Sequence, residues 1–112
     1  MTIQATPETE IATIARSILS ARNIECSKII LFGSRADGTA VNESDWDILI
    51  ILKTPVNGKM SKALWNDIFG KIHDVIPFIS IDLFITDQGT FDEEKDIVNT
   101  IHNEACAAGR PL

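Results

Sequence analysis

Two aspartates, Asp45 and Asp47, stand one residue apart just before an apolar run of the chain. Successive side chains of a β-strand point to opposite faces, so both carboxylates would project from the same face, roughly 6–7 Å apart. At an effective dielectric constant near 20, two such charges repel by about 2–3 kcal/mol. A structural loop gains nothing from this repulsion, whereas a divalent cation prefers carboxylate oxygens as ligands. The pair therefore predicts a metal site.

A glycine–serine pair, Gly33-Ser34, ends the first strongly apolar run of the chain. Glycine allows the backbone to approach a ligand closely. If a helical turn begins at the serine, its N–H groups and the hydroxyl would attract phosphate oxygens. The next residue, Arg35, could pair with a phosphate or with one of the acids. The dipeptide is common by itself, so it predicts a phosphate site only in combination with other residues.

A third carboxylate, Asp82, interrupts the alternating apolar pattern of residues 78–86 and shares a face with Ser80 and Phe84. An unpaired buried carboxylate is costly, so this position needs an explanation. Three carboxylates beside a phosphate cradle are what two-metal phosphoryl or nucleotidyl transfer requires. The third carboxylate can also accept the proton of an attacking hydroxyl. Asp87, further along in a predicted loop, is the alternative third acid.

Each of these residues also has a purely structural interpretation. Asp45 could be a loop acid before the strand, and Asp47 could be an exposed strand residue. Arg35 could be a structural ion-pair partner. Ser44 is interpreted as a cap of the turn into the second strand and not as a ligand contact. The metal-site hypothesis therefore depends on the combination of residues and not on any one of them.

Apolar periodicity and turn residues predict the elements that must position these side chains. Thr6 and Pro7 suit the start of a helix, and Gly109 followed by Pro111 suits the end of one. The predicted helices cover residues 7–22, 34–37, 60–73 and 91–108, and the predicted strands cover residues 28–32, 45–53 and 78–86. This order is typical of a three- or four-stranded sheet with helices packed on it, in an α/β or α+β two-layer domain.

Composition narrows the classes of protein. A chain of 112 residues with a hydrophobic share of 45% can form one globular domain, expected over residues 1–112. The net charge of -6 and the lack of a Lys/Arg cluster disfavour binding to nucleic acid and suit a metal–nucleotide site or a basic protein partner. No apolar run approaches the roughly 20 residues of a membrane helix. Cys26 and Cys106, isolated in a chain without a signal peptide, indicate reduced thiols and a cytoplasmic protein.

The segments GSRADG and SDWDI, with the later IDL, resemble the nucleotidyltransferase superfamily related to DNA polymerase beta. The family pattern is a Gly-Ser pair, then two carboxylates separated by one residue, then a third carboxylate on a later strand. It falls here on Gly33, Ser34, Asp45, Asp47 and Asp82. In so short a chain the first two motifs are most similar to the minimal nucleotidyltransferases, many of which are antitoxins paired with HEPN toxins.

The resemblance implies a mixed sheet flanked by helices and the transfer of a nucleoside monophosphate, AMP from ATP, to a hydroxyl. It assigns catalysis and the binding of two Mg²⁺ ions to the three aspartates, and nucleotide binding to Gly33, Ser34 and Arg35. One departure is Asp37, because minimal members often carry Arg or Lys at this position. The loss of this positive charge would weaken triphosphate binding or change the acceptor.

Three functions follow as hypotheses. The first is a Mg²⁺-dependent nucleotidyltransferase that modifies a protein hydroxyl, such as a tyrosine of a cognate HEPN toxin. The second is a non-catalytic antitoxin that neutralises its partner by masking it, which Asp37 and the acidic composition favour. The third is a catalytic domain for small-molecule acceptors, which the absence of room for a substrate domain disfavours.

Overall fold

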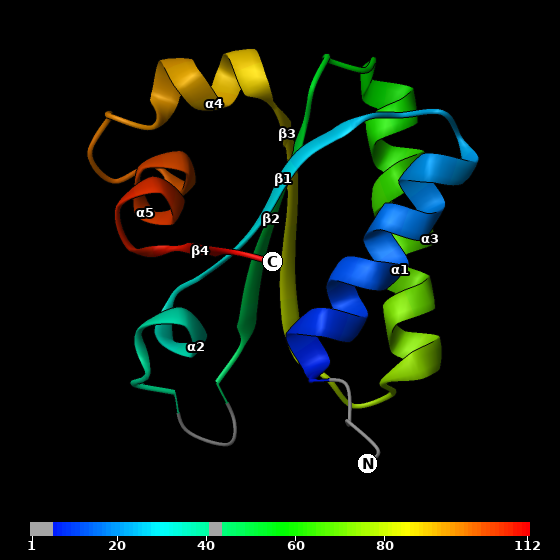
Figure 1. Ribbon diagram of the computed structural model, residues 1–112, viewed down its shortest axis with the longest axis horizontal. Coiled ribbons are helices and arrows are strands. Elements are labelled where there is room, and N and C mark those ends of the chain that lie inside the picture. The colour runs from blue at the N-terminus through cyan, green and yellow to red at the C-terminus, as the bar shows by residue number, and fades with distance from the viewer. Residues whose placement is uncertain (1–5, 41–43) are drawn as a thin grey trace.

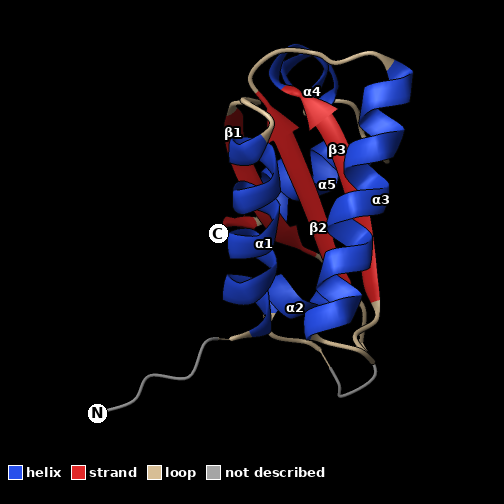
Figure 2. Cartoon of the chain, turned by 90° about the vertical axis from the view of Figure 1, so that its right-hand side faces the viewer, coloured by secondary structure: helices blue, strands red, loops and turns tan. Residues whose placement is uncertain are grey.

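Helices cover both faces of one four-stranded sheet in the computed structural model, which describes residues 6–40 and 44–112 (Figure 1). In chain order the elements are α1 (Pro7–Ala21), β1 (Cys26–Phe32), α2 (Ser34–Asp37), β2 (Trp46–Leu52), α3 (Gly58–Val75), β3 (Ile81–Asp87), α4 (Gln88–Glu94), α5 (Ile101–Ala108) and β4 (Arg110–Pro111). Helices α1 and α3 lie on one face of the sheet, and α4 and α5 lie on the other (Figure 2). The predicted mixed sheet flanked by helices is confirmed, but the helices on both faces make three layers and not the predicted two, because the central strands bury apolar side chains on both sides.

The strand order in the sheet is β3-β2-β1-β4. Strand β1 pairs with β2 and with β4 in antiparallel orientation, whereas β2 and β3 are parallel and are connected through α3. Parallel neighbours need such a crossover connection, because a tight turn cannot return the chain to the same end of the sheet. The starts of β2 and β3 therefore lie side by side at one end of the sheet.

Apolar side chains of β2 alternate between two core clusters. Ile48, Ile50 and Leu52 pack toward α1 and α3, and Leu49 and Ile51 pack in the cluster that includes residues of α4 and α5. All five side chains are buried, as expected for a central strand covered on both faces. The polar groups at the beginning of β2 are thus carried by a strand that the core holds firmly on both sides.

The first helix begins as predicted. The Thr6 hydroxyl accepts a hydrogen bond from the Thr9 N–H at 3.3 Å, and proline occupies the first helical position. Helix α3 is longer than predicted at both ends, because its cap is Asn57, which accepts from the Met60 N–H at 2.8 Å. An asparagine before the helix satisfies an N–H group that would otherwise lack a partner.

The single helix predicted over residues 91–108 is wrong. The structure has α4, then a turn, then α5, because Asn99 adopts φ 70° in the left-handed region and interrupts the helix. Asparagine tolerates this conformation better than most residues. The Thr100 hydroxyl then accepts from the Asn103 N–H at 3.0 Å and starts α5.

Two strand boundaries also differ from the prediction. Strand β1 begins at Cys26, two residues earlier than predicted, and β3 begins at Ile81, three residues later. The C-terminal segment, expected only to end a helix, pairs with β1 as β4. Its last residue, Leu112, donates its N–H to the Ile29 carbonyl at 2.8 Å and accepts from the Arg16 guanidinium at 3.1 Å.

Strand β3 forms the free edge of the sheet, and α3 covers part of that edge. The Trp65 indole N–H donates to the Leu83 carbonyl at 2.8 Å, and the indole stacks on Phe69 with ring centroids 4.4 Å apart. An edge strand presents unpaired N–H and C=O groups to solvent. Trp65 therefore satisfies one of the carbonyl groups that would otherwise lie open at this edge.

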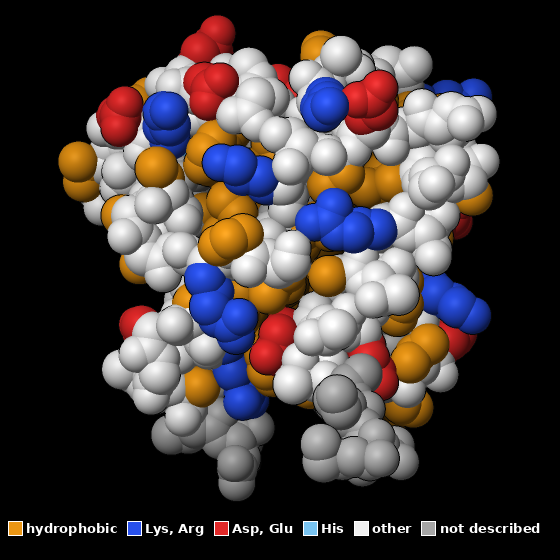
Figure 3. All heavy atoms as spheres, in the orientation of Figure 1, with side chains coloured by type: hydrophobic (Ala, Val, Ile, Leu, Met, Phe, Trp, Pro, Cys, Tyr) orange, Lys and Arg blue, Asp and Glu red, His pale blue; other side chains and the backbone are white. Residues whose placement is uncertain are grey.

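Charge is unevenly distributed over the surface. Although the net charge is -6, Lys and Arg side chains form a line down the middle of the face shown in Figure 3.

Within residues 6–40 and 44–112, no helix has the length and apolar character needed to cross a lipid bilayer.

Candidate active site

Asp47 and Asp82 lie beside each other on neighbouring strands. The parallel pairing of β2 and β3 places Asp47 opposite Asp82, with the same register continuing along both strands. In-register neighbours of a sheet share a face, so both carboxylates project from the side covered by α4 and α5. The structure thus brings together two carboxylates that are 35 residues apart in the sequence.

Burial and neighbouring charges perturb the Asp47 carboxyl group. Burial, then the charge of Asp82 and a hydrogen bond with its side chain, raise the pKa of Asp47 to about 6, with smaller contributions from Glu104 and Asp45. Like charges at short distance disfavour the ionised form of a carboxyl group. Asp47 therefore keeps its proton to a higher pH than an ordinary aspartate does, with a pKa of about 6.

Asp82 is exposed, although its position within an apolar strand had predicted a costly buried carboxylate. The physical reason is its place at the beginning of an edge strand, where solvent reaches the side chain. The expected desolvation cost falls instead on Asp47, which is half-buried at the start of the central strand β2.

Asp45 lies directly before β2 and contacts the residue that leads into β3. The Ser80 hydroxyl donates a hydrogen bond to Oδ1 of Asp45, and the Trp46 N–H donates to the Ser80 carbonyl at 2.8 Å. The Asp45 charge also contributes to the raised pKa of Asp47. All three predicted aspartates therefore lie at the same end of the β2–β3 pair.

Gly33 packs directly against the Asp47 carboxylate. It follows Phe32, which pairs with Asp47 across β1 and β2, and it adopts φ 74°. A Cβ atom at this position would lie 2.1 Å from Oδ2 of Asp47. Only glycine avoids both the strain of a positive φ and this steric overlap. The close approach that was predicted for a ligand is thus made to a carboxylate of the same chain.

Ser34 begins the short helix α2 immediately after Gly33. The N–H groups of Ala36 and Asp37 both donate to the Gly33 carbonyl, at 3.0 and 3.2 Å. This turn places Ser34 directly after the end of β1, one residue from the contact between Gly33 and Asp47. The Gly33-Ser34 pair therefore lies next to the aspartate pair of β2 and β3 through the contact between Gly33 and Asp47.

Arg35 makes contacts within the chain. Its Nε and one terminal nitrogen donate to the Ser44 carbonyl at 3.2 and 3.0 Å, and the guanidinium lies 4.4 Å from the centre of the Trp46 ring. A guanidinium over an indole face is attracted by the electrons of the ring. Arg35 thus stabilises the segment that leads to Asp45. The structural role predicted for Arg35 was an ion pair, whereas its partner here is a backbone carbonyl group.

Asp37, the acidic residue in the GSRADG segment, stabilises the turn after α2. Its Oδ1 accepts from the Thr39 N–H at 2.9 Å and from the Thr39 hydroxyl at 2.6 Å, and these bonds hold the pKa of Asp37 below its usual value. The next residue, Gly38, adopts φ 82° and ends the helix. The carboxylate is therefore occupied in local structure.

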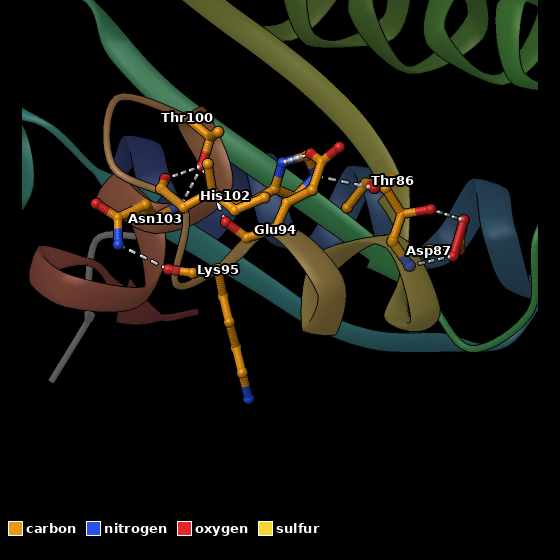
Figure 4. Close-up of polar contacts among 9 residues, drawn as sticks. Thr86, Asp87, Glu94, Lys95, Thr100, His102 and Asn103 are labelled. Carbon is orange, nitrogen blue, oxygen red and sulfur yellow. Dashed lines mark hydrogen bonds and ion pairs between the residues drawn. The ribbon is translucent and has the colours of Figure 1, made fainter.

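The alternative third acid, Asp87, lies at the other end of β3. It caps α4 by accepting hydrogen bonds from the N–H and the hydroxyl of Thr90, both at 2.8 Å (Figure 4). These bonds hold its pKa below the usual value. Asp87 lies five positions further along the strand than Asp82, and at roughly 3.3 Å per residue it is too distant to join the three aspartates.

A polar network fixes α5, the helix that carries Glu104 (Figure 4). The His102 imidazole bridges Glu94 at 2.7 Å through Nδ1 and the Thr86 hydroxyl at 3.0 Å through Nε2. The Asn103 side-chain amide donates to the Lys95 carbonyl at 2.7 Å. These contacts join α4, α5 and β3, and so they hold the charge of Glu104 where it acts on Asp47.

The comparisons with known proteins decide the family. The family model described as "Polymerase beta, Nucleotidyltransferase" matches residues 14–104, which is most of the chain. This chain belongs to that family.

Two solved structures share the fold of this nucleotidyltransferase. One is described as a toxin-antitoxin with AMP-PNP, with TM-score 0.53 and 17% identity over 88% of this chain and 69% of that chain. The other is a mutant of the toxin-antitoxin MntA-HpeT, with TM-score 0.52 and 16% identity over 96% of this chain and 72% of that chain. No curated protein matches the sequence.

The donor set of the candidate site, three carboxylates, fits a hard divalent cation. Among the described residues, no three His, Cys, Asp or Glu side chains are gathered closely enough to hold a metal ion. Asp47 instead lies opposite Asp82 across β2 and β3, and Asp45 accepts a hydrogen bond from Ser80. Crowding that raises a carboxyl pKa to about 6 is what a cation would relieve, because it replaces the proton as the counter-charge.

Two residues that act on the aspartates, Ser80 through a hydrogen bond and Glu104 through its charge, were missed from the sequence. Ser80 had been placed on the same strand face as Asp82, and this shared face was the signal that could have identified it. Glu104 gave no such signal, because the predicted continuous helix over residues 91–108 did not allow for the turn that re-aims α5.

Proposed function

We propose that this nucleotidyltransferase transfers a nucleoside monophosphate, AMP from ATP, to a hydroxyl group of a helical partner protein, with a tyrosine of a HEPN-type toxin as the acceptor. The observation that carries the proposal is the parallel register that sets Asp82 beside Asp47, whose carboxylate packs against Gly33. The descriptions of the two similar structures, a toxin-antitoxin with AMP-PNP and the toxin-antitoxin MntA-HpeT, support both the nucleotide and the class of partner.

Asp45, Asp47 and Asp82 are the residues that would hold Mg²⁺. Two bound ions would neutralise charge on the triphosphate and favour in-line displacement at phosphorus. Carboxylates serve this purpose because their oxygens suit hard cations. Asp45 and Asp47 would supply ligand oxygens from the beginning of β2, and Asp82 would supply them from the beginning of β3.

The chain's own groups would orient the reactants and move the proton. The Ser34 hydroxyl would donate to phosphate oxygens at the turn after β1. Asp82 would accept the proton of the acceptor hydroxyl. The hydroxyl oxygen then forms a bond to the α-phosphorus, the bond from that phosphorus to the β-phosphate oxygen breaks, and pyrophosphate leaves with the electron pair.

The test is the mass of the partner protein after co-expression. With the wild-type chain, the expected result is a partner heavier by one or more nucleoside monophosphate groups, and Asp47→Asn should remove this addition. Asp87→Asn is the matched control, since it changes a carboxylate at the far end of the neighbouring strand β3, where it caps α4. Transfer that persists at the wild-type level in Asp47→Asn would contradict the proposal.

A second candidate function is neutralisation of the partner by masking, without catalysis. The engagement of both charged side chains of the GSRADG segment favours it, because Asp37 binds Thr39 and Arg35 binds the Ser44 carbonyl. Neutralisation that survives Asp47→Asn, together with no nucleotide binding by calorimetry, would support masking. Neutralisation that is lost with Asp47→Asn while the partner remains bound would exclude it.

A further inference from the structure

Ser80 is joined to the Asp45 segment through both its side chain and its backbone. The hydroxyl donates to Oδ1 of Asp45, and the carbonyl accepts from the Trp46 N–H at 2.8 Å. The backbone bond fixes where Ser80 stands relative to Asp45, because it begins the parallel pairing of β2 and β3. The Ser80 hydroxyl is therefore held next to one oxygen of the Asp45 carboxylate, Oδ1.

The chemistry of this contact suits a metal ligand. A serine hydroxyl has one proton to donate, so it engages one carboxylate oxygen and leaves Oδ2 of Asp45 for another contact. Hydrogen bonds to a ligating carboxylate orient it and reduce the ordering needed when the ion binds. Both side chains are exposed, so water competes for the bond and its contribution to folding is small.

We infer that Ser80 is a positioning residue that orients the Asp45 carboxylate for divalent-cation binding. This inference rests on the proposed function, in which Asp45 holds Mg²⁺. A merely structural role would instead be to fasten the start of β3 to β2, and it would affect the melting temperature without a specific effect on metal binding.

The test is Mn²⁺ binding to the full chain, measured by electron paramagnetic resonance with a non-hydrolysable ATP analogue. Ser80→Thr and Ser80→Val are the matched variants, because both are β-branched and differ only by a hydroxyl in place of a methyl group. Ser80→Val should weaken Mn²⁺ binding about tenfold relative to Ser80→Thr, as loss of an outer-shell partner does at other metal sites.

Ser27→Ala is the control for the loss of a serine hydrogen bond elsewhere. The Ser27 hydroxyl donates to the Gln88 side chain at 2.6 Å and joins the start of β1 to α4. This variant should bind Mn²⁺ as the wild type does. The melting temperatures of all variants show whether any change in binding follows from a loss of folding.

Asp47→Asn separates the two ways in which the inference can fail. If the wild type binds Mn²⁺, Asp47→Asn abolishes binding, and the two Ser80 variants bind equally well, then the positioning role is overturned and the proposed function stands. If the wild type shows no Mn²⁺ binding that depends on Asp47, then the proposed function fails and the role of Ser80 fails with it.

Discussion

Asp47 is constrained by three neighbouring parts of the structure. It is the second residue of the central strand, its carboxylate packs against Gly33, and it pairs with Asp82 across β2 and β3. A carboxylate in this position opposes folding when it is ionised, because burial and neighbouring negative charges both penalise its charge. This behaviour is expected of a metal ligand, because its charge destabilises the metal-free fold and a bound cation supplies the counter-charge.

The first prediction concerns the pH dependence of stability in buffer without divalent cations. The folded state raises the pKa of Asp47 from 3.8 to about 6, so it binds more protons than the unfolded state in this window. Stability therefore falls as pH rises through the window. Asp47→Asn removes the charge and should be more stable than the wild type at pH 7.5, by about 1 kcal/mol after allowance for solvent screening. The difference should vanish near pH 4.

Urea unfolding at several pH values measures this effect, and Asp87→Asn is its control with the opposite sign. Hydrogen bonds from Thr90 lower the pKa of Asp87, so this carboxylate stabilises the folded state above its unfolded pKa and loses the effect as pH falls through the folded pKa. A metal-free Asp47→Asn variant that is less stable than the wild type at pH 7.5 would show that Asp47 is not penalised by its neighbours.

At the scale of elements, the interruption between α4 and α5 decides which residues reach the site. Left-handed backbone at Asn99 ends the first segment, and the Thr100 cap starts the second. The His102 imidazole then ties α5 to α4 and β3. The position of α5, and with it the charge of Glu104, depends on one largely buried side chain that makes two polar contacts.

The second prediction is that His102→Ala loosens α5. The change removes both imidazole contacts and leaves the Thr86 hydroxyl and the Glu94 carboxylate without this partner, so the free energy of unfolding should fall by about 1–3 kcal/mol. Hydrogen exchange should quicken in α5 before it quickens in β2. Phe78→Ser is the control, because Phe78 is 100% exposed and its loss should change neither measurement. Unchanged exchange in α5 would contradict the role given to His102.

Sequence patterns predicted some elements better than others for physical reasons. Helix α1 and strand β2 follow from local periodicity and a Thr-Pro start, which act within a few residues of each other. The turn at Asn99 was missed because a helix-forming stripe on both sides of it looks continuous. The pairing of residues 110–111 with β1 was missed because a strand this short has no period of its own.

Some features of the candidate site could likewise be predicted from the sequence, and others could not. The spacing of Asp45 and Asp47 is a local property, so it could be read from the chain. The register between Asp47 and Asp82 depends on the length and packing of α3, so it cannot be predicted from a local sequence pattern. Steric contact between Gly33 and Asp47 likewise arises only when β1 and β2 are paired.

At the scale of the whole molecule, the third prediction is a stability linkage with ligands. Mg²⁺ and ATP together should raise the melting temperature, since a ligand at 100 times its Kd adds about 2.7 kcal/mol to the free energy of unfolding. A chelator should reverse the shift, and ATP without Mg²⁺ should give little, because the chain carries a net charge of -6. Calorimetry checks this, with Asp47→Asn as the variant that loses the shift and Asp87→Asn as the one that keeps it. An equal shift from ATP alone would contradict metal-dependent binding.

The indole of Trp65 on the outer carbonyl of Leu83 has a consequence for behaviour at high concentration. Strands whose outer amides and carbonyls are open can recruit a strand from a second molecule and begin aggregation. By occupying that carbonyl and covering the edge with its ring, Trp65 makes such recruitment less favourable next to the strand that carries Asp82. The same side chain that helps to fold the domain thereby helps to keep neighbouring molecules apart.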